Sequence, residues 1–252
     1  MKSKEYKMTI HKLNLNNRAF NAIINGTKKV ELRASSDENN YNDYEIGDKI
    51  IFKNDNNEEI MCKIVANNHY NSVEELLMLE GTRYTTSSTN DYNEAIDNIL
   101  KLNGYKEKIQ KNGIHAIHVV FLYNLNNIWN ELYLAAKAVL KPREVSPSIE
   151  TGGVAAAILT EEGNIYTGVC IDTACSLGMC AERNAIGNML TQGESKIVKL
   201  LCIGRHDDNI MMPCGACREI LMQLGNNDME IITDLKNEST ILLKDLILSW
   251  WK

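Results

Sequence analysis

The chain has 252 residues and a mass of 28.4 kDa, which suits two domains of ordinary size better than one. Hydrophobic residues make up 44% of it and charged residues 24%, a composition typical of a globular protein rather than a disordered one. The formal net charge is −6, with 16 basic and 17 acidic side chains up to residue 125 and 11 and 16 after it. Neither part has the positive excess of a typical polyanion binder.

The first 17 residues are charged and lack the apolar stretch of a signal peptide. No apolar run approaches the roughly 20 residues that span a bilayer. We therefore expect a cytoplasmic protein with no membrane partner. Thiols stay reduced in that compartment, so the seven cysteines favour metal binding or catalysis over disulfides.

Strands are predicted to dominate the core of the first half. Alternating apolar residues and flanking turn residues predict strands at residues 10–15, 29–33, 46–52, 59–66 and 114–122. Helical spacing predicts helices at residues 17–25, 73–79 and 92–102. Gly26 follows the first helix, as glycine commonly does at helix ends. Residues 124–127 are the predicted junction, which gives domains 1–125 and 126–252.

The second half is predicted to alternate strands and helices. It begins with a helix at residues 128–140, which Pro142 ends, and a loop at 141–153. The elements predicted after the loop are strands at 154–159 and 164–171, a helix at 180–190, a strand at 199–204, a helix at 214–224, a strand at 229–233 and a short helix at 242–248. This β-β-α-β-α-β order predicts an α/β fold with a mixed sheet and helices on its faces.

Cys180, Cys214 and Cys217 stand where a strand or loop gives way to a predicted helix. A helix N-terminus favours the thiolate, which is the form that binds a metal. Cys214 and Cys217 are three residues apart and therefore lie on one helix face, within reach of one ion. Catalytic zinc sites commonly have three protein ligands and leave a fourth position open, whereas structural sites usually have four. The sequence therefore predicts a catalytic Zn²⁺ site, although Cys-x-x-Cys alone also occurs in redox pairs and structural zinc sites.

Glu182 follows Cys180 by two residues and, in the first helical turn, can face the same opening. Its carboxylate is predicted to move protons rather than to bind the metal. Hydrolysis of an amidine carbon needs such a general acid/base. Cys170, Cys175 and Cys202 are predicted to be small buried apolar residues, with Cys175 close enough in sequence to be a candidate fourth ligand.

The second half resembles the small cytidine and blasticidin S deaminases in three stretches, namely Thr167-Gly168, residues 180–186 (CAERNAI) and residues 213–221 (PCGACREIL). The resemblance covers about residues 129–251. It implies a three-layer α/β/α fold, a zinc hydroxide that attacks C4 of a cytosine-type base, and a homotetramer or dimer. It also implies that the three cysteines bind the metal and that Glu182 is the proton shuttle.

The resemblance gives Arg183 a role as well. Three thiolates around Zn²⁺ leave a charge of −1, and an arginine that donates to the sulfurs would offset it. The other interpretation of Arg183 is a solvated surface residue.

The chain departs from the family pattern where the family holds ribose. Gly153, Cys170 and Asp172 stand where the family has Asn, Asn and Glu, and we expect them, with Ala181, to contact the substrate. Gly153 cannot donate a side-chain hydrogen bond and Asp172 is one methylene shorter than Glu. The sequence therefore does not decide between cytidine or deoxycytidine and a blasticidin-type, modified or base-only substrate.

The first half resembles the ASCH domain, a small β-barrel related to the RNA-binding PUA fold, over about residues 8–123. The resemblance lies in residues 25–33 (NGTKKVELR) and 46–52 (IGDKIIF). It implies a nucleotide or RNA pocket lined by Lys28, Glu31 and Arg33, with the guanidinium on a phosphate or base edge. The other interpretation is a solvated strand face on which these charges pair with one another.

These features predict a zinc-dependent deaminase of a cytosine-type nucleoside or analogue, fused to an ASCH-like domain. One alternative is a nucleotide- or RNA-binding protein in which the deaminase fold is structural. A second is a deaminase of a base within RNA, which the acidic second half disfavours.

Overall fold

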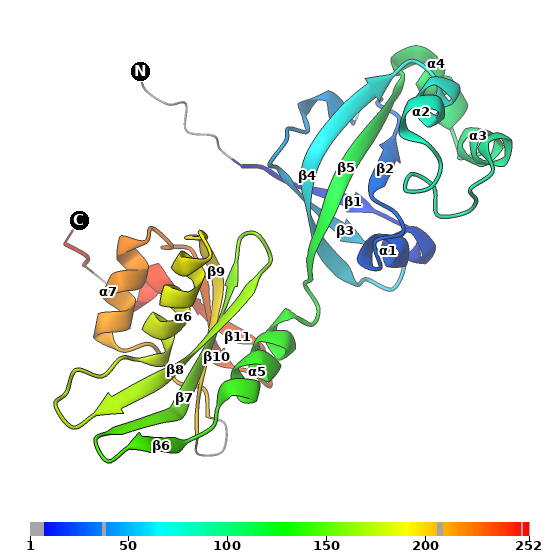
Figure 1. Cartoon of the computed structure of the whole chain (residues 1–252). Helices are drawn as coiled ribbons and strands as arrows, with labels where there is room; N and C mark the ends of the chain where they lie inside the picture. The colour runs from blue at the N-terminus through cyan, green and yellow to red at the C-terminus, as the bar shows by residue number, and fades with distance from the viewer. Residues whose placement is uncertain (1–7, 37–38, 206–208, 248, 252) are drawn as a thin grey trace. The chain divides into compact units, whose positions relative to one another are not determined.

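A computed structural model describes residues 8–36, 39–205, 209–247 and 249–251. The chain divides into two compact units, Met1–Asn126 and Asn127–Lys252, each with its own hydrophobic core (Figure 1). No helix within the described ranges is both long and apolar enough to cross a membrane.

Unit 1, residues 1–126, is built on one mixed sheet with the strand order β1-β3-β4-β5-β2. The strands are β1 (Ile10–Asn14), β2 (Val30–Arg33), β3 (Lys49–Lys53), β4 (Glu59–Tyr70) and β5 (Ile114–Asn124). Among the described strand pairs of this unit, only β1–β3 is parallel, and register shifts in the long β4–β5 pair bend the sheet.

A small β-barrel is predicted for this half, and the strand pairing does not confirm it. A closed barrel requires the two edge strands to pair. Among the residues that the structure describes, β1 pairs only with β3 and β2 only with β5, so the sheet is open.

Helices cover unit 1 in two places. They are α1 (Asn17–Ile24), α2 (Val73–Glu80), α3 (Tyr92–Leu100) and α4 (Tyr105–Asn112), with a short 3-10 turn at Tyr41–Asp43. Phe20 of α1 packs with Phe52 in one core, while Leu76, Ile99 and Ile109 of α2, α3 and α4 form another. The sequence did not predict α4, because Ile109 is its only buried side chain.

Unit 2, residues 127–252, contains a mixed sheet with the path β11-β10-β9-β7-β6 and with β8 paired to β7. The strands are β6 (Arg143–Ser146), β7 (Ile149–Thr160), β8 (Ile165–Thr173), β9 (Ile197–Gly204), β10 (Glu230–Asp234) and β11 (Ser239–Leu242). The central strand, β7, is completely buried from Ala155 to Leu159, which explains its continuous apolar run. β6 and β11 lie outside the predicted strands.

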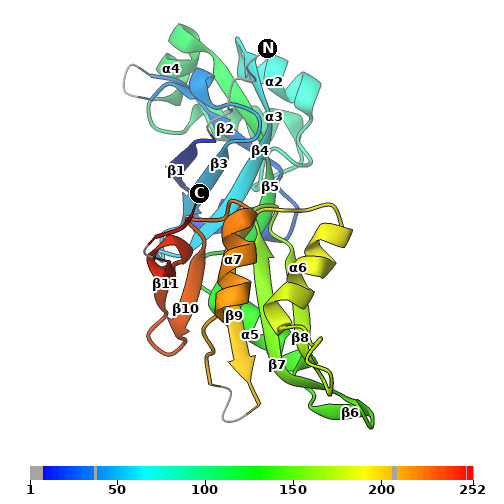
Figure 2. The ribbon, with the colours of Figure 1, turned by 90° about the vertical axis from the view of Figure 1, so that its left-hand side faces the viewer.

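Three helices cover the two faces of this sheet. They are α5 (Ile128–Val139), α6 (Ala181–Thr191) and α7 (Gly215–Gln223), and a 3-10 turn spans Leu243–Leu246. Figure 2 shows α6 and α7 in front of the sheet and α5 behind it. Alternate residues of a strand point to opposite faces. Accordingly, Leu200 and Cys202 pack in the core beneath α6 and α7, whereas Lys199 reaches the ring of Trp129 in α5.

Gly168 on β8 brings α6 directly onto the sheet. A Cβ at this position would overlap the backbone N of Ala185 and the backbone O of Ala181, both in α6. The absence of a side chain therefore sets the distance at which the helix packs, and with it the position of the helix N-terminus.

Candidate metal centre and pocket

Two helix N-termini bring three cysteine sulfurs together in unit 2. Cys180 is the N-cap of α6 and Cys214 the N-cap of α7, each with extended backbone, and Cys217 lies in the first turn of α7. The Cys214 Sγ atom is 3.6 Å from the Sγ atoms of both Cys180 and Cys217. All three sulfurs lie within 4.8 Å of one another, so one ion can be reached by all of them.

Similar local structure positions both helices. Before α6, the chain leaves β8 and returns to it through an isolated bridge between Ile171 and Met179, directly before Cys180. Before α7, a bridge between Ile203 and Ile210 returns the chain to β9 ahead of Cys214. Cys180 and Cys214 therefore each start a helix shortly after a bridge that pairs the chain with a strand of the sheet.

The surroundings of the sulfurs favour thiolates at some positions and oppose them at others. The backbone N–H of Cys217 is the main cause of a lowered pKa at Cys214, as expected for a cap on a helix N-terminus. Burial raises the pKa of Cys217 and of Cys180. The charge of the Glu182 carboxylate also raises the pKa of Cys217.

Arg183 supplies a positive charge next to the cluster. Its pKa is raised first by a hydrogen bond to Cys180 and also by the charges of the other two thiols. Its Nη2 donates to the backbone O of Gly178 at 3.4 Å. The guanidinium can therefore offset the negative charge that three thiolates accumulate.

The donor set suits Zn²⁺, since thiolate sulfur is a common zinc ligand and three protein ligands leave a position open. Within the described ranges, this is the group of His, Cys, Asp and Glu side chains with metal-binding spacing. Cys175, the candidate fourth ligand, is exposed, and its sulfur lies beside the Thr173 hydroxyl instead.

A cavity of about 530 Å³ opens beside the sulfurs. Cys180, Cys214 and the buried Glu182 form one part of its wall. A volume of this size is in the range of small-molecule sites. The carboxylate of Glu182 therefore shares one cavity with two of the three sulfurs.

The predicted substrate residues lie around this cavity, with one exception. Cys170, Asp172 and Ala181 line it. The Cys170 Sγ accepts from the Val154 N–H at 3.3 Å and donates to the Asp172 Oδ2 at 3.4 Å, so these groups form one chain of contacts. Gly153 lies next to Cys170, but Val154 forms the wall at this point.

Several lining residues were not predicted from the sequence. They are Val154, Met179, Cys202, Met211 and Met212, together with residues of the segment between β8 and α6. The adjacent Met211 and Met212 stand just before Pro213 and Cys214, and this proximity in sequence to a metal motif was the available signal. Their flexible thioethers give the cavity an apolar, adaptable side.

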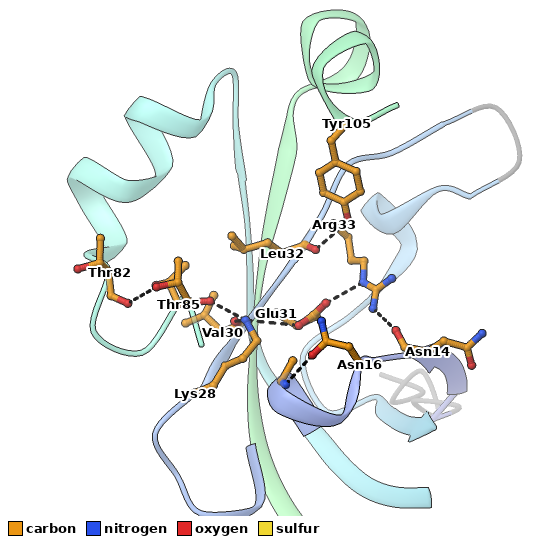
Figure 3. A network of polar contacts seen from close by, with 12 residues as sticks. Asn14, Asn16, Lys28, Val30, Glu31, Leu32, Arg33, Thr82, Thr85 and Tyr105 are labelled. Atoms are coloured by element: carbon orange, nitrogen blue, oxygen red, sulfur yellow. Dashed lines mark hydrogen bonds and ion pairs between the residues drawn. The ribbon is translucent and has the colours of Figure 1, made fainter. Parts of the chain in front are cut away.

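Lys28, Glu31 and Arg33 of unit 1 form one connected cluster (Figure 3). The Lys28 Nζ lies 3.4 Å from the Glu31 Oε2, and the Arg33 Nε lies 3.0 Å from the Glu31 Oε1. Lys28 and Glu31 are each only 6% exposed. The charges therefore pair with one another, in agreement with one of the two interpretations of this strand. They do so inside the protein rather than on a solvated face.

Comparison with known proteins finds a match to the family model described as "Cytidine and deoxycytidylate deaminase zinc-binding region" at residues 129–233. A cytidine deaminase of Sporosarcina psychrophila is 36% identical over 87 residues, which are 34% of this chain and 63% of that protein. A probable cytidine deaminase of Dictyostelium discoideum is 32% identical over 88 residues, 34% of this chain and 58% of that protein. The chain thus spans less than two thirds of the length of these curated relatives.

Similar solved structures include the cytidine deaminase of Mycobacterium leprae, with 26% identity and a TM-score of 0.41 over 48% of this chain and 98% of that one. The cytidine deaminase of Bacillus anthracis has 27% identity and a TM-score of 0.40 over 50% and 90%. The family match includes all three cysteines, Glu182 and Arg183. Over residues 129–233, the chain is similar to the zinc-binding region of the cytidine and deoxycytidylate deaminases.

Proposed function

We propose that unit 2 is a zinc-dependent hydrolytic deaminase that acts on a cytosine-type nucleoside and releases ammonia. One observation carries the proposal: three cysteine sulfurs lie within 4.8 Å of one another, and two of these cysteines line a cavity together with a buried carboxylate, Glu182. The similarity of this region to deaminases supports the same reaction.

Cys180, Cys214 and Cys217 would hold Zn²⁺, which when bound supplies a Lewis acid that lowers the pKa of water. Glu182 is placed to accept a proton from the attacking water and to deliver protons to the ring nitrogen and to the departing amine. Burial of this carboxylate excludes bulk water from the transfer. Arg183 is placed to offset the negative charge of the three thiolates, which would keep a bound Zn²⁺ a stronger Lewis acid.

The charge of the cavity favours a nucleoside over a nucleotide. Asp172 and Glu182 both line it, and none of the described residues that line it is a lysine or an arginine. The negative charge of these two carboxylates would repel a phosphate dianion. Asp172 can instead accept hydrogen bonds from sugar hydroxyls, as a carboxylate has only acceptors. The same argument disfavours a base within RNA.

Ammonia release tests this proposal on a panel of cytidine, deoxycytidine, cytosine, blasticidin S, N4-modified cytidines and deoxycytidine monophosphate. We expect turnover of an uncharged or cationic member and at least about a 100-fold loss in Glu182→Gln, the scale of a positioned general acid/base. Glu182→Gln should keep its metal, because glutamine preserves the shape of the side chain. Full metal content without turnover of any member would favour the alternative in which the deaminase fold is structural.

We also propose that unit 1 is an ASCH-like domain and that the protein forms a homodimer or homotetramer. The buried Lys28–Glu31–Arg33 cluster beside a pocket supports the assignment of unit 1.

Exposed apolar side chains near the cavity of unit 2 support the assembly. Leu177 is 84% exposed close to the cavity wall formed by Ser176 and Gly178, and Met211 and Met212 are also exposed. A neighbouring subunit would cover such apolar side chains. Light scattering of the purified protein tests the assembly.

A further inference from the structure

A second pocket, of about 400 Å³, lies in unit 1. It is bordered by the N-terminal part of α1, by strand β2, by the hydroxyl-rich segment 85–88 and by the region of α3 and α4. Three cationic side chains, Arg18, Lys28 and Arg33, line it, against one carboxylate, that of Glu31. The lining therefore has an excess of positive charge, the opposite of the cavity in unit 2.

Lys28 and Glu31 line this pocket and belong to a network of polar contacts (Figure 3). The Lys28 Nζ donates to the backbone O of Val30 at 2.6 Å and of Thr85 at 2.5 Å, and the ammonium also faces Glu31. These three partners use the three N–H donors of lysine. Lys28 is thus left without a donor for a ligand, and its charge is largely neutralised by Glu31.

Arg33 and Arg18 carry the positive charge that a ligand in the pocket could contact. The Arg33 Nε faces Glu31, and its Nη2 donates to the backbone O of Asn14 at 2.7 Å, which fixes the guanidinium and leaves donors on its outer edge. Arg18 is exposed and has no ion pair within the described part of the chain. Two guanidinium groups therefore line the pocket, and the one carboxylate among the described lining residues, that of Glu31, also pairs with Lys28.

Thr85 supplies an independent indication of a ligand. This residue lines the pocket and is completely buried, yet its hydroxyl has no hydrogen-bond partner among the described residues. A buried hydroxyl without a partner destabilises the folded state, and such groups commonly mark functional sites. The hydroxyls of Ser87 and Ser88 line the same pocket.

We infer that this pocket binds a small organic phosphomonoester, such as a nucleoside or sugar monophosphate. Two guanidinium groups and several hydroxyls supply more donors than a carboxylate can accept, whereas a phosphate dianion has three strong acceptor oxygens. A phosphodiester within a nucleic acid has only one charge and fewer free oxygens. Leu102, 50% exposed on the lining, and Tyr105 supply apolar surface for the organic part. The inference is independent of deamination in unit 2.

The test is calorimetry of the full chain with ribose 5-phosphate, UMP, ribose and an oligouridylate without terminal phosphates. Neither phosphate ester contains the amino group that a deaminase would remove. We expect both esters to bind with a Kd below about 1 mM and ribose not to bind. Raising the salt from about 0.05 M to about 0.5 M should weaken the esters, because ions screen exposed charges.

Two variants locate the site. Arg18→Ala should weaken both esters about tenfold, the scale of a lost charge-assisted hydrogen bond. Thr85→Val should weaken them similarly while leaving the Tm of the ligand-free protein unchanged or a few degrees higher, because it removes an unpaired buried hydroxyl. Lys106→Ala is the matched control, since Lys106 is an exposed cation of unit 1 outside the pocket and should leave binding unchanged.

Four results would overturn the inference. They are no binding of either ester, equal binding of ribose, tighter binding of the oligouridylate than of UMP, and wild-type binding in both Arg18→Ala and Thr85→Val. The Tm in Thr85→Val separates a lost contact from a damaged fold, because misfolding would lower it.

Discussion

At the scale of single residues, the metal site depends on where each thiol lies relative to its helix. Cys217 is fully buried beneath Cys180 and Cys214, inside the first turn of α7. We expect Cys217→Ser to lose most of its zinc, because serine is a poorer zinc ligand and the two remaining sulfurs cannot complete the site. The measurement is metal analysis of protein purified in parallel with the wild type.

Cys175→Ser is the matched control for Cys217→Ser. Cys175 is also a thiol of unit 2 and stands close to α6 in sequence, but it is exposed and outside the sulfur cluster. It should keep wild-type zinc. Equal loss of zinc in both variants would show that the metal does not depend on the predicted ligand set.

His115 on β5 is predicted to make the stability of unit 1 depend on pH. Its ring is 2% exposed, and its Nδ1 lies 3.1 Å from the Asn67 Oδ1. Its Nε2 is buried without a partner among the described residues. Burial, with a contribution from His69, lowers the pKa of His115 to about 4. The folded state therefore favours the neutral ring, with Nδ1 donating to Asn67.

A histidine with a lowered pKa stabilises the fold fully above its unfolded pKa of about 6.5 and loses that contribution as the pH falls towards 4. The loss for His115 is at most about 3 kcal/mol, from about 1.4 kcal/mol per pH unit. Urea unfolding followed by circular dichroism should show wild type losing more stability than His115→Gln between pH 7.5 and pH 4.5. Identical losses in the two proteins would show that another group controls the acid sensitivity.

At the scale of elements, Gly168 determines how closely α6 packs on β8. Gly168→Ala would place a Cβ against the backbone of Ala181 and Ala185, which cannot move without shifting the whole helix. We expect a loss of about 3 kcal/mol in the free energy of unfolding, at the upper end for overpacking. Zinc affinity should fall with it, because Cys180 caps this helix. Urea unfolding and metal analysis measure the two effects.

At Gly187, in the same helix, we expect substitution by alanine to have the opposite effect on stability. A Cβ there would meet no atom within 4 Å, and the residue is exposed on α6. Gly187→Ala should therefore stabilise the protein by about 0.5–1 kcal/mol, since glycine is unfavourable in a helix interior. If both alanine variants were equally stable, close packing at Gly168 would not set the position of α6.

Secondary-structure elements with a buried face are predicted more accurately from the sequence than exposed elements. Strands and helices with a buried face were predicted within a few residues, as for α5 (Ile128–Val139), expected at 128–140. The edge strand β6 falls within a predicted loop, because its four residues are mostly exposed and show no apolar alternation. The sequence pattern records burial, so elements held mainly by backbone pairing leave little trace in it.

The residues of the candidate sites also differ in how well the sequence predicts them. Cysteines at two predicted helix starts led to the sulfurs that the structure brings together, since helix caps have a local sequence signal. Thr85 could not be found in this manner. Its backbone O accepts from Lys28, 57 residues earlier, and its hydroxyl has no partner among the residues that the structure describes, so its position follows from tertiary structure alone.

At the scale of the whole molecule, the two units have separate cores, and their connection is short. Leu125 donates its N–H to the backbone O of Glu59, and the Asn126 Oδ1 accepts from the Glu59 N–H, so both belong to unit 1. The backbone O of Asn127 accepts from Glu131 and starts α5 of unit 2. A cut between residues 126 and 127 therefore breaks none of these hydrogen bonds.

The positions of the tryptophans allow each unit to be followed separately. Trp129, Trp250 and Trp251 all lie in unit 2, so tryptophan fluorescence reports on that unit alone. We expect isolated 127–252 to bind zinc and to unfold in urea at the same midpoint as the full chain, because its core contains no residue of unit 1. A clearly lower midpoint, or loss of zinc, would show that unit 1 stabilises unit 2. Unfolding of the full chain followed by circular dichroism should then contain a second transition without a fluorescence change, from the unit that has no tryptophan.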